Sequence, residues 1–179
     1  MEIYLIRHTT PEIAKGICYG QSDILLASSF KDEVAQILKN NSFPENDVVV
    51  YSSPLQRCKQ LAETVFNVTA INYDNRLKEL NFGDWELKPW DAINKEELTI
   101  WMEDFVHVPC PNGESYVDLN NRVLEFKKSL KSAKHKKVVV VTHAGIIRAF
   151  LAQHNNVKLE DSFQYKISLG AVIKIEDKS

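Results

Sequence analysis

Two histidines stand directly after short apolar runs that have the composition of buried strands. Residues 3–6 (IYLI) lead into the adjacent pair Arg7 and His8, and residues 137–142 (KVVVVT) lead into His143. Such runs are typical of parallel strands covered on both faces, and polar residues at their carboxyl ends lie where ligands bind. Neighbouring strands lie about 5 Å apart, so two imidazoles at adjacent strand ends could face each other across a phosphate-sized gap. This arrangement requires the two strands to be neighbours.

Arg57 and Glu79 complete a set of side chains suited to phosphoryl transfer. Ser53 and Pro54 are typical of a helix start, which would place Arg57 near the helix N-terminus, where backbone N–H groups favour an anion. Two arginines can hold a phosphate, a neutral imidazole can attack phosphorus, and a second histidine can stabilise charge on oxygen. A carboxylic acid can protonate the leaving alkoxide and later activate water. Together the residues favour transfer through a phosphohistidine, although each taken alone also fits a structural role.

The chain has the size and composition of one globular domain. It has 179 residues, of which 44% are hydrophobic and 26% are charged, which suffices for a single core. A net charge of -2 without a basic block gives nucleic acid no particular attraction. No apolar run approaches the roughly 20 residues of a membrane span, and no secretory pattern is present. We therefore expect a single cytoplasmic domain over residues 1–179, without nucleic-acid or membrane partners.

The cysteines and the remaining histidines lack the spacing of a metal site or a disulfide framework. Three cysteines are an odd number without CxxC spacing, so we interpret them as reduced packing residues, with Cys18 the one that could line a pocket. The isolated histidines lack metal-ligand spacing and favour surface or structural roles; they are His107, His135 and His154. No metal or other cofactor is predicted.

Strand-like and helix-like segments alternate along the chain. Strands are expected near residues 3–6, 47–52, 70–73, 137–143 and 168–175, and helices over 29–41, 53–66, parts of 90–105, 115–134 and after His143. This alternation predicts an α/β three-layer sandwich with a mostly parallel central sheet. A polar loop over 11–26 follows the first strand and could fold over a ligand. In the helix over 115–134, Ser115 and Asp118 fit a capping box, and the residues expected to face inward are Val117, Leu124 and Leu130.

Four segments follow one another over nearly the whole chain: Arg7-His8, SSPLQRCKQLA at 52–62, RLKELNFGDWE at 76–86 and THAGIIR at 142–148. In this order and spacing they resemble the histidine phosphatase superfamily, the phosphoglycerate mutase-like proteins. The resemblance implies a phosphoglycerate mutase-like fold. It also implies roles for five residues: His8 as nucleophile, Glu79 as proton donor, and Arg7, Arg57 and His143 as the phosphate pocket.

Two further segments resemble one branch of that superfamily more closely. GICYGQSDILL at 16–26 and GDWE at 83–86 look like the α-ribazole phosphatases, which remove a 5′-phosphate during assembly of the cobalamin nucleotide loop. In this interpretation the substrate is a small phosphorylated molecule. Tyr19 and Gln21, in the loop after the first strand, and Ala144, directly after His143, are expected to contact it.

Three positions depart from the common pattern of the family. Thr9 replaces the Gly that usually follows the Arg-His pair, and Ala14 stands where many members have an Asn near the phosphate. Leu87 replaces a Gly that often follows Trp-Glu. We expect the first two departures to weaken one phosphate contact, and so to affect rate and substrate range rather than the class of reaction.

A phosphomonoesterase is the favoured function, and other functions stay open. The runner-up is a phosphoglycerate mutase-type phosphotransferase, although such mutases are usually longer. A non-catalytic module that binds a phospho-ligand or a protein is another alternative. Such a module would be expected to lack a catalytic residue, and none is missing. A protein phosphohistidine phosphatase is a further alternative, but such proteins tend to be shorter. Glu114 could lie at the edge of the site or could interact with the dipole at the start of a helix. Core packing is favoured for Trp85, Trp90 and Trp101. Both a monomer and a dimer are compatible with the sequence.

Overall fold

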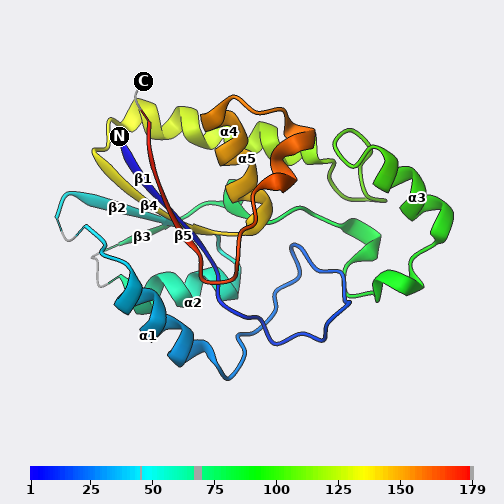
Figure 1. Cartoon of the computed structure of the whole chain (residues 1–179), viewed down its shortest axis with the longest axis horizontal. Coiled ribbons are helices and arrows are strands. Elements are labelled where there is room, and N and C mark those ends of the chain that lie inside the picture. The colour runs from blue at the N-terminus through cyan, green and yellow to red at the C-terminus, as the bar shows by residue number, and fades with distance from the viewer. Residues whose placement is uncertain (45, 67–69, 178–179) are drawn as a thin grey trace.

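A computed structural model describes residues 1–44, 46–66 and 70–177. Its centre is a five-stranded sheet with the order β3-β2-β4-β1-β5 (Figure 1). Strands β1 to β4 run parallel, and β5 pairs antiparallel with β1. The strand bounds are Glu2–Arg7 (β1), Val48–Ser52 (β2), Ile71–Tyr73 (β3), Lys137–Thr142 (β4) and Val172–Glu176 (β5). The predicted mostly parallel central sheet is confirmed.

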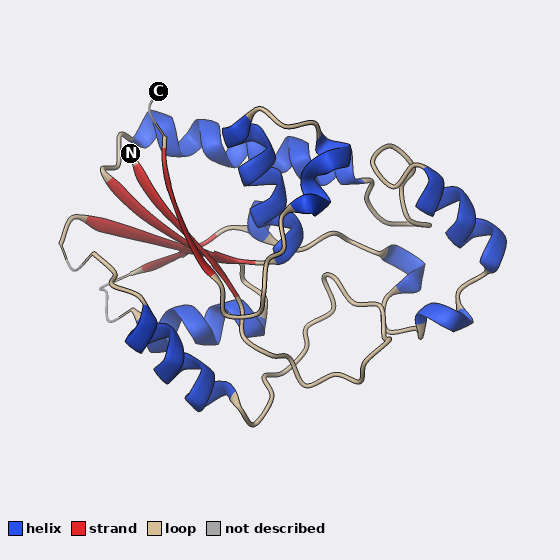
Figure 2. Cartoon of the chain, in the orientation of Figure 1, coloured by secondary structure: helices blue, strands red, loops and turns tan. Residues whose placement is uncertain are grey.

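Helices cover both faces of this sheet (Figure 2). In β4, Val138 and Val140 belong to the core beneath α4 and α5, whereas Val139 and Val141 belong to the core beneath α1 and α2. Successive side chains of a strand point to opposite faces, so one run of valines supplies both cores. The predicted three-layer α/β sandwich is therefore confirmed. The helix bounds are Phe30–Asn40 (α1), Gln56–Val65 (α2), Tyr116–Ala133 (α4) and Ala144–Asn155 (α5).

A long excursion between β3 and α4 leaves the sheet, at the right of Figure 1. It carries the helix α3, Lys95–Glu103, and an isolated bridge between Ile17 and Pro89 joins it to the loop after β1. None of the helices in the described ranges is long and apolar enough to cross a membrane. The short 3-10 helices are Asn75–Leu77 (η1), Gly83–Trp85 (η2), Trp90–Ala92 (η3) and, between α5 and β5, Leu159–Gln164 (η4).

Helix α2 begins later than the sequence predicts, at Gln56 rather than at Ser53. The backbone N–H of Gln56 donates to Oδ1 of Asp23 at 2.7 Å. A carboxylate from the loop after β1 thus satisfies one of the free N–H groups at the helix start, in place of the expected Ser53 cap. Arg57 still lies in the first turn, as expected.

Two smaller expectations are corrected and one is confirmed. The last strand begins at Val172, because residues 168–171 form a turn in which Gly170 has a φ of +68°. Leu124 is 37% exposed on α4 and does not face inward. The capping box of α4 is present: the Ser115 hydroxyl accepts from the Asp118 N–H at 3.2 Å, and the Ser115 N–H donates to Asp118 Oδ2 at 3.0 Å.

Candidate active site

His8 and His143 lie side by side at one edge of the sheet. Strand β1 pairs with β4 in a register that places Arg7 opposite Thr142, so the next residue of each strand is a histidine. The two imidazole centroids are 5.2 Å apart, with the rings inclined at 60°. Both side chains are buried. The adjacency that the strand-end pattern required is therefore present.

The surroundings of His8 leave its imidazole neutral, with one nitrogen free to react. Nδ1 lies 2.7 Å from the carbonyl oxygen of Thr9. A carbonyl only accepts hydrogen bonds, so this contact assigns the proton to Nδ1 and leaves a lone pair on Nε2. Burial lowers the pKa of His8 to about 3, and the charges of Arg57 and Arg7 act in the same direction against the opposing Thr9 contact. The ring is thus neutral near pH 7.

The side chain of His143 is held by two residues at or just before the start of α2, Ser53 and Cys58. Its Nε2 lies 2.9 Å from the Ser53 hydroxyl and 3.4 Å from the Cys58 sulfur. Burial, followed by the charge of Arg57, lowers its pKa well below the ordinary histidine value. Sequence reasoning missed this role of Ser53, although Ser53 lies within the motif that carries Arg57.

Arg57 is fully buried, and its guanidinium is held by backbone carbonyls. Nη1 donates to the carbonyl of Ser22 at 2.9 Å, and Nη2 donates to that of Gly20. The guanidinium carbon lies 5.4 Å from the centroid of the Tyr19 ring. Nε of Arg57 has no hydrogen-bond partner within the described ranges. The arginine therefore keeps both its charge and one N–H group for an anion.

Arg7 shows the same arrangement on the other side of His8. Nη1 donates to the carbonyl of Ile167 at 2.5 Å, while Nε has no partner among the residues that the structure describes. Burial lowers the pKa of Arg7, and the Glu79 carboxylate opposes that shift. One fully buried and one half-buried guanidinium group thus line the same cavity as a neutral imidazole, which is an arrangement suited to a phosphate.

Glu86 holds the loop whose carbonyls bind Arg57. Its carboxylate accepts from the backbone N–H groups of Gly20, Gln21 and Ser22 at 3.0, 2.8 and 3.0 Å, and from the Ser22 hydroxyl at 2.5 Å. Burial alone would raise the pKa of Glu86, but these hydrogen bonds together lower it. Glu86 belongs to a matched motif, yet its role depends on a contact between segments far apart in sequence.

Glu79 lies in the segment between η1 and η2 and reaches the start of α5. One carboxylate oxygen accepts from the N–H of Gly145 at 3.1 Å, and the other accepts from the N–H of Leu80 at 3.1 Å. A Cβ at position 145 would lie 2.3 Å from Glu79 Oε1. The close approach of the carboxylate to α5 therefore requires a glycine there.

A cavity of about 420 Å³ opens beside these groups. Arg7, His8, Arg57 and Glu79 lie at one part of it, and Arg148 adds a further guanidinium. The rest of its lining is mostly aromatic and comes from the excursion, from α4, from η4 and from the loop after β1: Tyr19, Phe82, Trp90, Trp101, Phe105, Tyr116 and Phe163. The cavity thus joins a charged end to an aromatic wall.

The expected core role is confirmed for Trp85, which is 2% exposed, and Trp90 and Trp101 are half-buried and pack against the same core. Trp90 and Trp101 line the cavity and stack on each other, with centroids 6.3 Å apart and planes at 29°. Periodicity could not reveal that they also line the cavity, because this depends on the contact between η3 and α3 rather than on the pattern within either element.

The other candidate residues divide between the cavity and its support. Tyr19 and Ala144 line the cavity, whereas Gln21 donates from its side-chain amide to the carbonyl of Glu79 at 3.1 Å. Glu114 pairs with Arg122 at 2.9 Å. Cys18 is fully buried rather than pocket-lining. Within the described residues, no group of three His, Cys, Asp or Glu side chains could hold a metal ion, and the free, buried cysteines are Cys18, Cys58 and Cys110.

The three departures from the family pattern occupy different surroundings. Thr9 is buried next to His8, and its hydroxyl has no partner in the part of the chain that the structure describes. Ala14 is exposed in the loop after β1. Leu87 has a φ of +64°, a left-handed conformation that glycine adopts at lower cost, which explains why glycine suits this position.

Proteins similar in sequence include several phosphatases. The chain is 25% identical to the adenosylcobalamin/alpha-ribazole phosphatase of Escherichia coli, over 95% of this chain and 87% of that protein. It is 28% identical to a Hydrogenobacter thermophilus protein provisionally named phosphoserine phosphatase 2, over 97% and 88%. It is 30% identical to the metal-independent phosphoserine phosphatase of Arabidopsis thaliana, over 83% and 66%.

A solved phosphatase structure shares the fold of this chain, and a family profile matches almost its whole length. The alpha-ribazole phosphatase from Shigella flexneri superposes with a TM-score of 0.85 at 23% identity, covering 98% of this chain and 90% of that one, which shows a shared fold. The profile of the histidine phosphatase superfamily (branch 1) matches residues 3–178. With the paired histidines, the flanking arginines and this match over almost its whole length, the chain belongs to the histidine phosphatase superfamily, branch 1.

Proposed function

We propose that this chain is a phosphomonoesterase that works through a phosphohistidine on His8. The observation that carries the proposal is the free Nε2 lone pair of a neutral, buried imidazole that shares its cavity with two guanidinium groups whose Nε atoms are unpartnered within the described ranges. A phosphate monoester dianion placed there has a nucleophile and two cations around one phosphorus atom. The phosphatases among the relatives support the same class of reaction.

The proposed reaction has two steps. Nε2 of His8 attacks phosphorus, the bond from phosphorus to the ester oxygen breaks, and Glu79 gives its proton to the departing alkoxide. Arg7, Arg57 and the imidazole N–H of His143 stabilise the charge on the non-bridging oxygens. Water then attacks the phosphohistidine, the Glu79 carboxylate takes up its proton, and inorganic phosphate and neutral His8 are released.

The aromatic wall favours a leaving group with a planar, apolar part. We propose α-ribazole 5′-phosphate as the substrate, because its ring system could pack against Trp90 and Trp101 while its phosphate lies beside His8. A second candidate is phosphoserine. Arg148 favours it, because this guanidinium lines the cavity and could pair with a carboxylate.

The covalent intermediate is directly testable. Rapid quenching during turnover should trap an acid-labile, base-stable phosphoryl group on His8, and a His8→Asn variant should lose it together with nearly all activity. His107→Asn, which changes an exposed histidine, should keep both. Because the nucleophile is a side chain, activity should also survive EDTA. Substantial turnover by His8→Asn, or activity that returns only when Mg²⁺ is added, would contradict the mechanism.

The neutrality of His8 predicts how stability depends on pH. Its pKa is about 3 in the folded chain against an ordinary value of 6.5, so the unfolded chain binds one more proton in that window and stability falls as the pH falls. Between pH 7 and pH 5 this residue should cost roughly 2 kcal/mol of unfolding free energy. Urea unfolding in phosphate-free buffer should therefore show a shallower pH dependence for His8→Asn. Equal dependence in both proteins would show that His8 is not held neutral.

The role of Glu79 predicts a dependence on the leaving group. An alkoxide needs a proton to leave, whereas a nitrophenolate does not, so Glu79→Gln should slow phosphoenzyme formation far more for an alkyl phosphate. The two effects should differ by up to roughly 10²- to 10⁴-fold. Single-turnover phosphoenzyme formation is the step to measure, because steady-state rates include the later hydrolysis. Equal slowing with both substrates would reassign Glu79 to positioning or folding.

The substrate proposal is tested by comparing kcat/KM for α-ribazole 5′-phosphate and O-phosphoserine. Trp101→Leu should lower the value roughly tenfold for the first substrate and little for the second, because only the first has a ring to stack. Met102→Leu changes the neighbouring, 64% exposed side chain and serves as the control. A preference of the unaltered protein for phosphoserine would favour the second candidate. Phosphoryl exchange between positions of phosphoglycerate without release of phosphate would instead indicate a mutase.

A further inference from the structure

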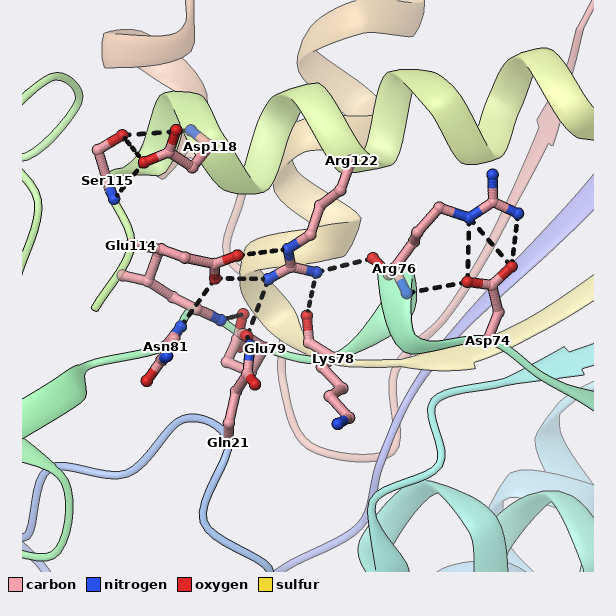
Figure 3. Close-up of polar contacts among 11 residues, drawn as sticks. Gln21, Asp74, Arg76, Lys78, Glu79, Asn81, Glu114, Ser115, Asp118 and Arg122 are labelled. Atoms are coloured by element: carbon pink, nitrogen blue, oxygen red, sulfur yellow. Dashed lines mark hydrogen bonds and ion pairs between the residues drawn. The ribbon is translucent and has the colours of Figure 1, made fainter. Parts of the chain in front are cut away.

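Arg122, on α4, binds the chain segment that carries Glu79 (Figure 3). Its Nη1 donates to the carbonyls of Arg76 and Lys78 at 2.7 and 2.5 Å, and its Nη2 donates to the carbonyl of Glu79 at 2.9 Å. These carbonyls follow one another closely along an irregular stretch of backbone. One planar side chain thus fixes the path of that stretch immediately before and at Glu79.

Glu114 fixes the guanidinium of Arg122 and the other side of the same segment. Nε and Nη2 of Arg122 donate to its two carboxylate oxygens at 2.9 and 3.0 Å. The carboxylate also accepts from the backbone N–H of Asn81 at 2.9 Å. Figure 3 shows the pair lying between α4 and the segment on both sides of Glu79. The backbone is therefore held before and after the residue whose carboxylate must be aimed.

Glu79 needs such support because it has no regular element of its own. It lies between two short 3-10 helices, and its carboxylate meets the start of α5 at Gly145. A proton donor works only within hydrogen-bond reach of the leaving oxygen, and a displacement of about 1 Å can cost about 10²-fold in rate. A change in the backbone path at residues 76–81 would draw the carboxylate away from its contact with the Gly145 N–H.

We propose that Arg122 is a positioning residue for the proton donor Glu79, and that Glu114 supports it by orienting the guanidinium and by holding the backbone at Asn81. Arg122 does not touch the phosphate in this arrangement, because every N–H of its guanidinium is used by Glu114 and the three carbonyls. Its side chain is 14% exposed and its charge is paired with Glu114. A lysine could not replace it, since an ammonium lacks the planar fork that meets these acceptors together.

The proposal rests on the role of Glu79 proposed above, so its test uses the same leaving-group comparison. Arg122→Gln should slow single-turnover phosphoenzyme formation about tenfold or more with an alkyl phosphate, and less than about twofold with a nitrophenyl phosphate. Arg76→Gln is the matched control. It removes an arginine from the same segment whose side chain pairs with Asp74 at 2.6 Å rather than with the Glu79 backbone, and it should show no such difference between the substrates.

A double variant separates positioning from general damage. Added to Glu79→Gln, Arg122→Gln should slow the alkyl phosphate reaction by less than about twofold, because no proton donor is left to misplace. Equal slowing of both substrates by Arg122→Gln, or full slowing in the Glu79→Gln background, would overturn the positioning role. If Glu79→Gln itself slowed both substrates equally, the proton-donor step would fail and the positioning role with it. That outcome is measured with Glu79→Gln alone, so a failure of the proton-donor role is distinguished from a failure of the positioning role.

Glu114→Gln provides a second route if Arg122→Gln fails to fold. It preserves the shape of the side chain but removes the charge that orients the guanidinium. The same selectivity for the alkyl phosphate, smaller in size, is expected. A folded Glu114→Gln protein that processes both substrates at the original rates would overturn the link from Glu114 through Arg122.

Discussion

The charged end of the cavity is built on two guanidinium groups, one fully buried and one half-buried, that neutral acceptors hold. Arg7 and Arg57 are bound by backbone carbonyls of Ile167, Gly20 and Ser22, and neither forms an ion pair among the described residues. Carbonyls satisfy N–H groups without cancelling charge, so the positive potential is kept for an anion. The same potential, added to burial, keeps both strand-end histidines neutral. The imidazole of His8 can therefore stand beside two cations without being protonated.

This constraint explains why the loop after β1 is tied so firmly. The carbonyls of Gly20 and Ser22 must stay in place to hold Arg57. The carboxylate of Glu86 fixes this stretch by accepting from the backbone N–H groups of Gly20, Gln21 and Ser22. The loop, the excursion and α2 thus form one connected support, with Asp23 from the same loop at the start of α2. Arg7, Arg57 and Glu79 are each held by a polar group from a segment distant in sequence, whereas His8 is held by the carbonyl of its neighbour Thr9.

The charged part and the aromatic part of the cavity lining come from different parts of the fold. Strand ends and the first turn of α2 supply the two histidines, Arg7 and Arg57, whose spacing follows from the pairing of the strands. The aromatic wall comes mainly from residues 82–105 and η4, which are attached to the sheet through side-chain packing. Such segments can change without disturbing strand pairing. This separation is consistent with one reaction chemistry serving different leaving groups in related proteins.

The sequence was sufficient to predict the sandwich architecture, the strand-end histidines and the place of Arg57 in a first helical turn, because each rests on local periodicity or on a motif spanning a few residues. It also placed the α4 capping box, which is a contact within one turn. The folded chain was needed to establish the start of α2, the exposure of Leu124, the contribution of Trp90 and Trp101 to the cavity lining, and the use of Gln21, Glu86 and Arg122 as supports. Those outcomes depend on partners far away in sequence. A carboxylate or an amide has the same local pattern whether it meets substrate, solvent or a distant backbone, and only the folded chain brings that partner within hydrogen-bond distance.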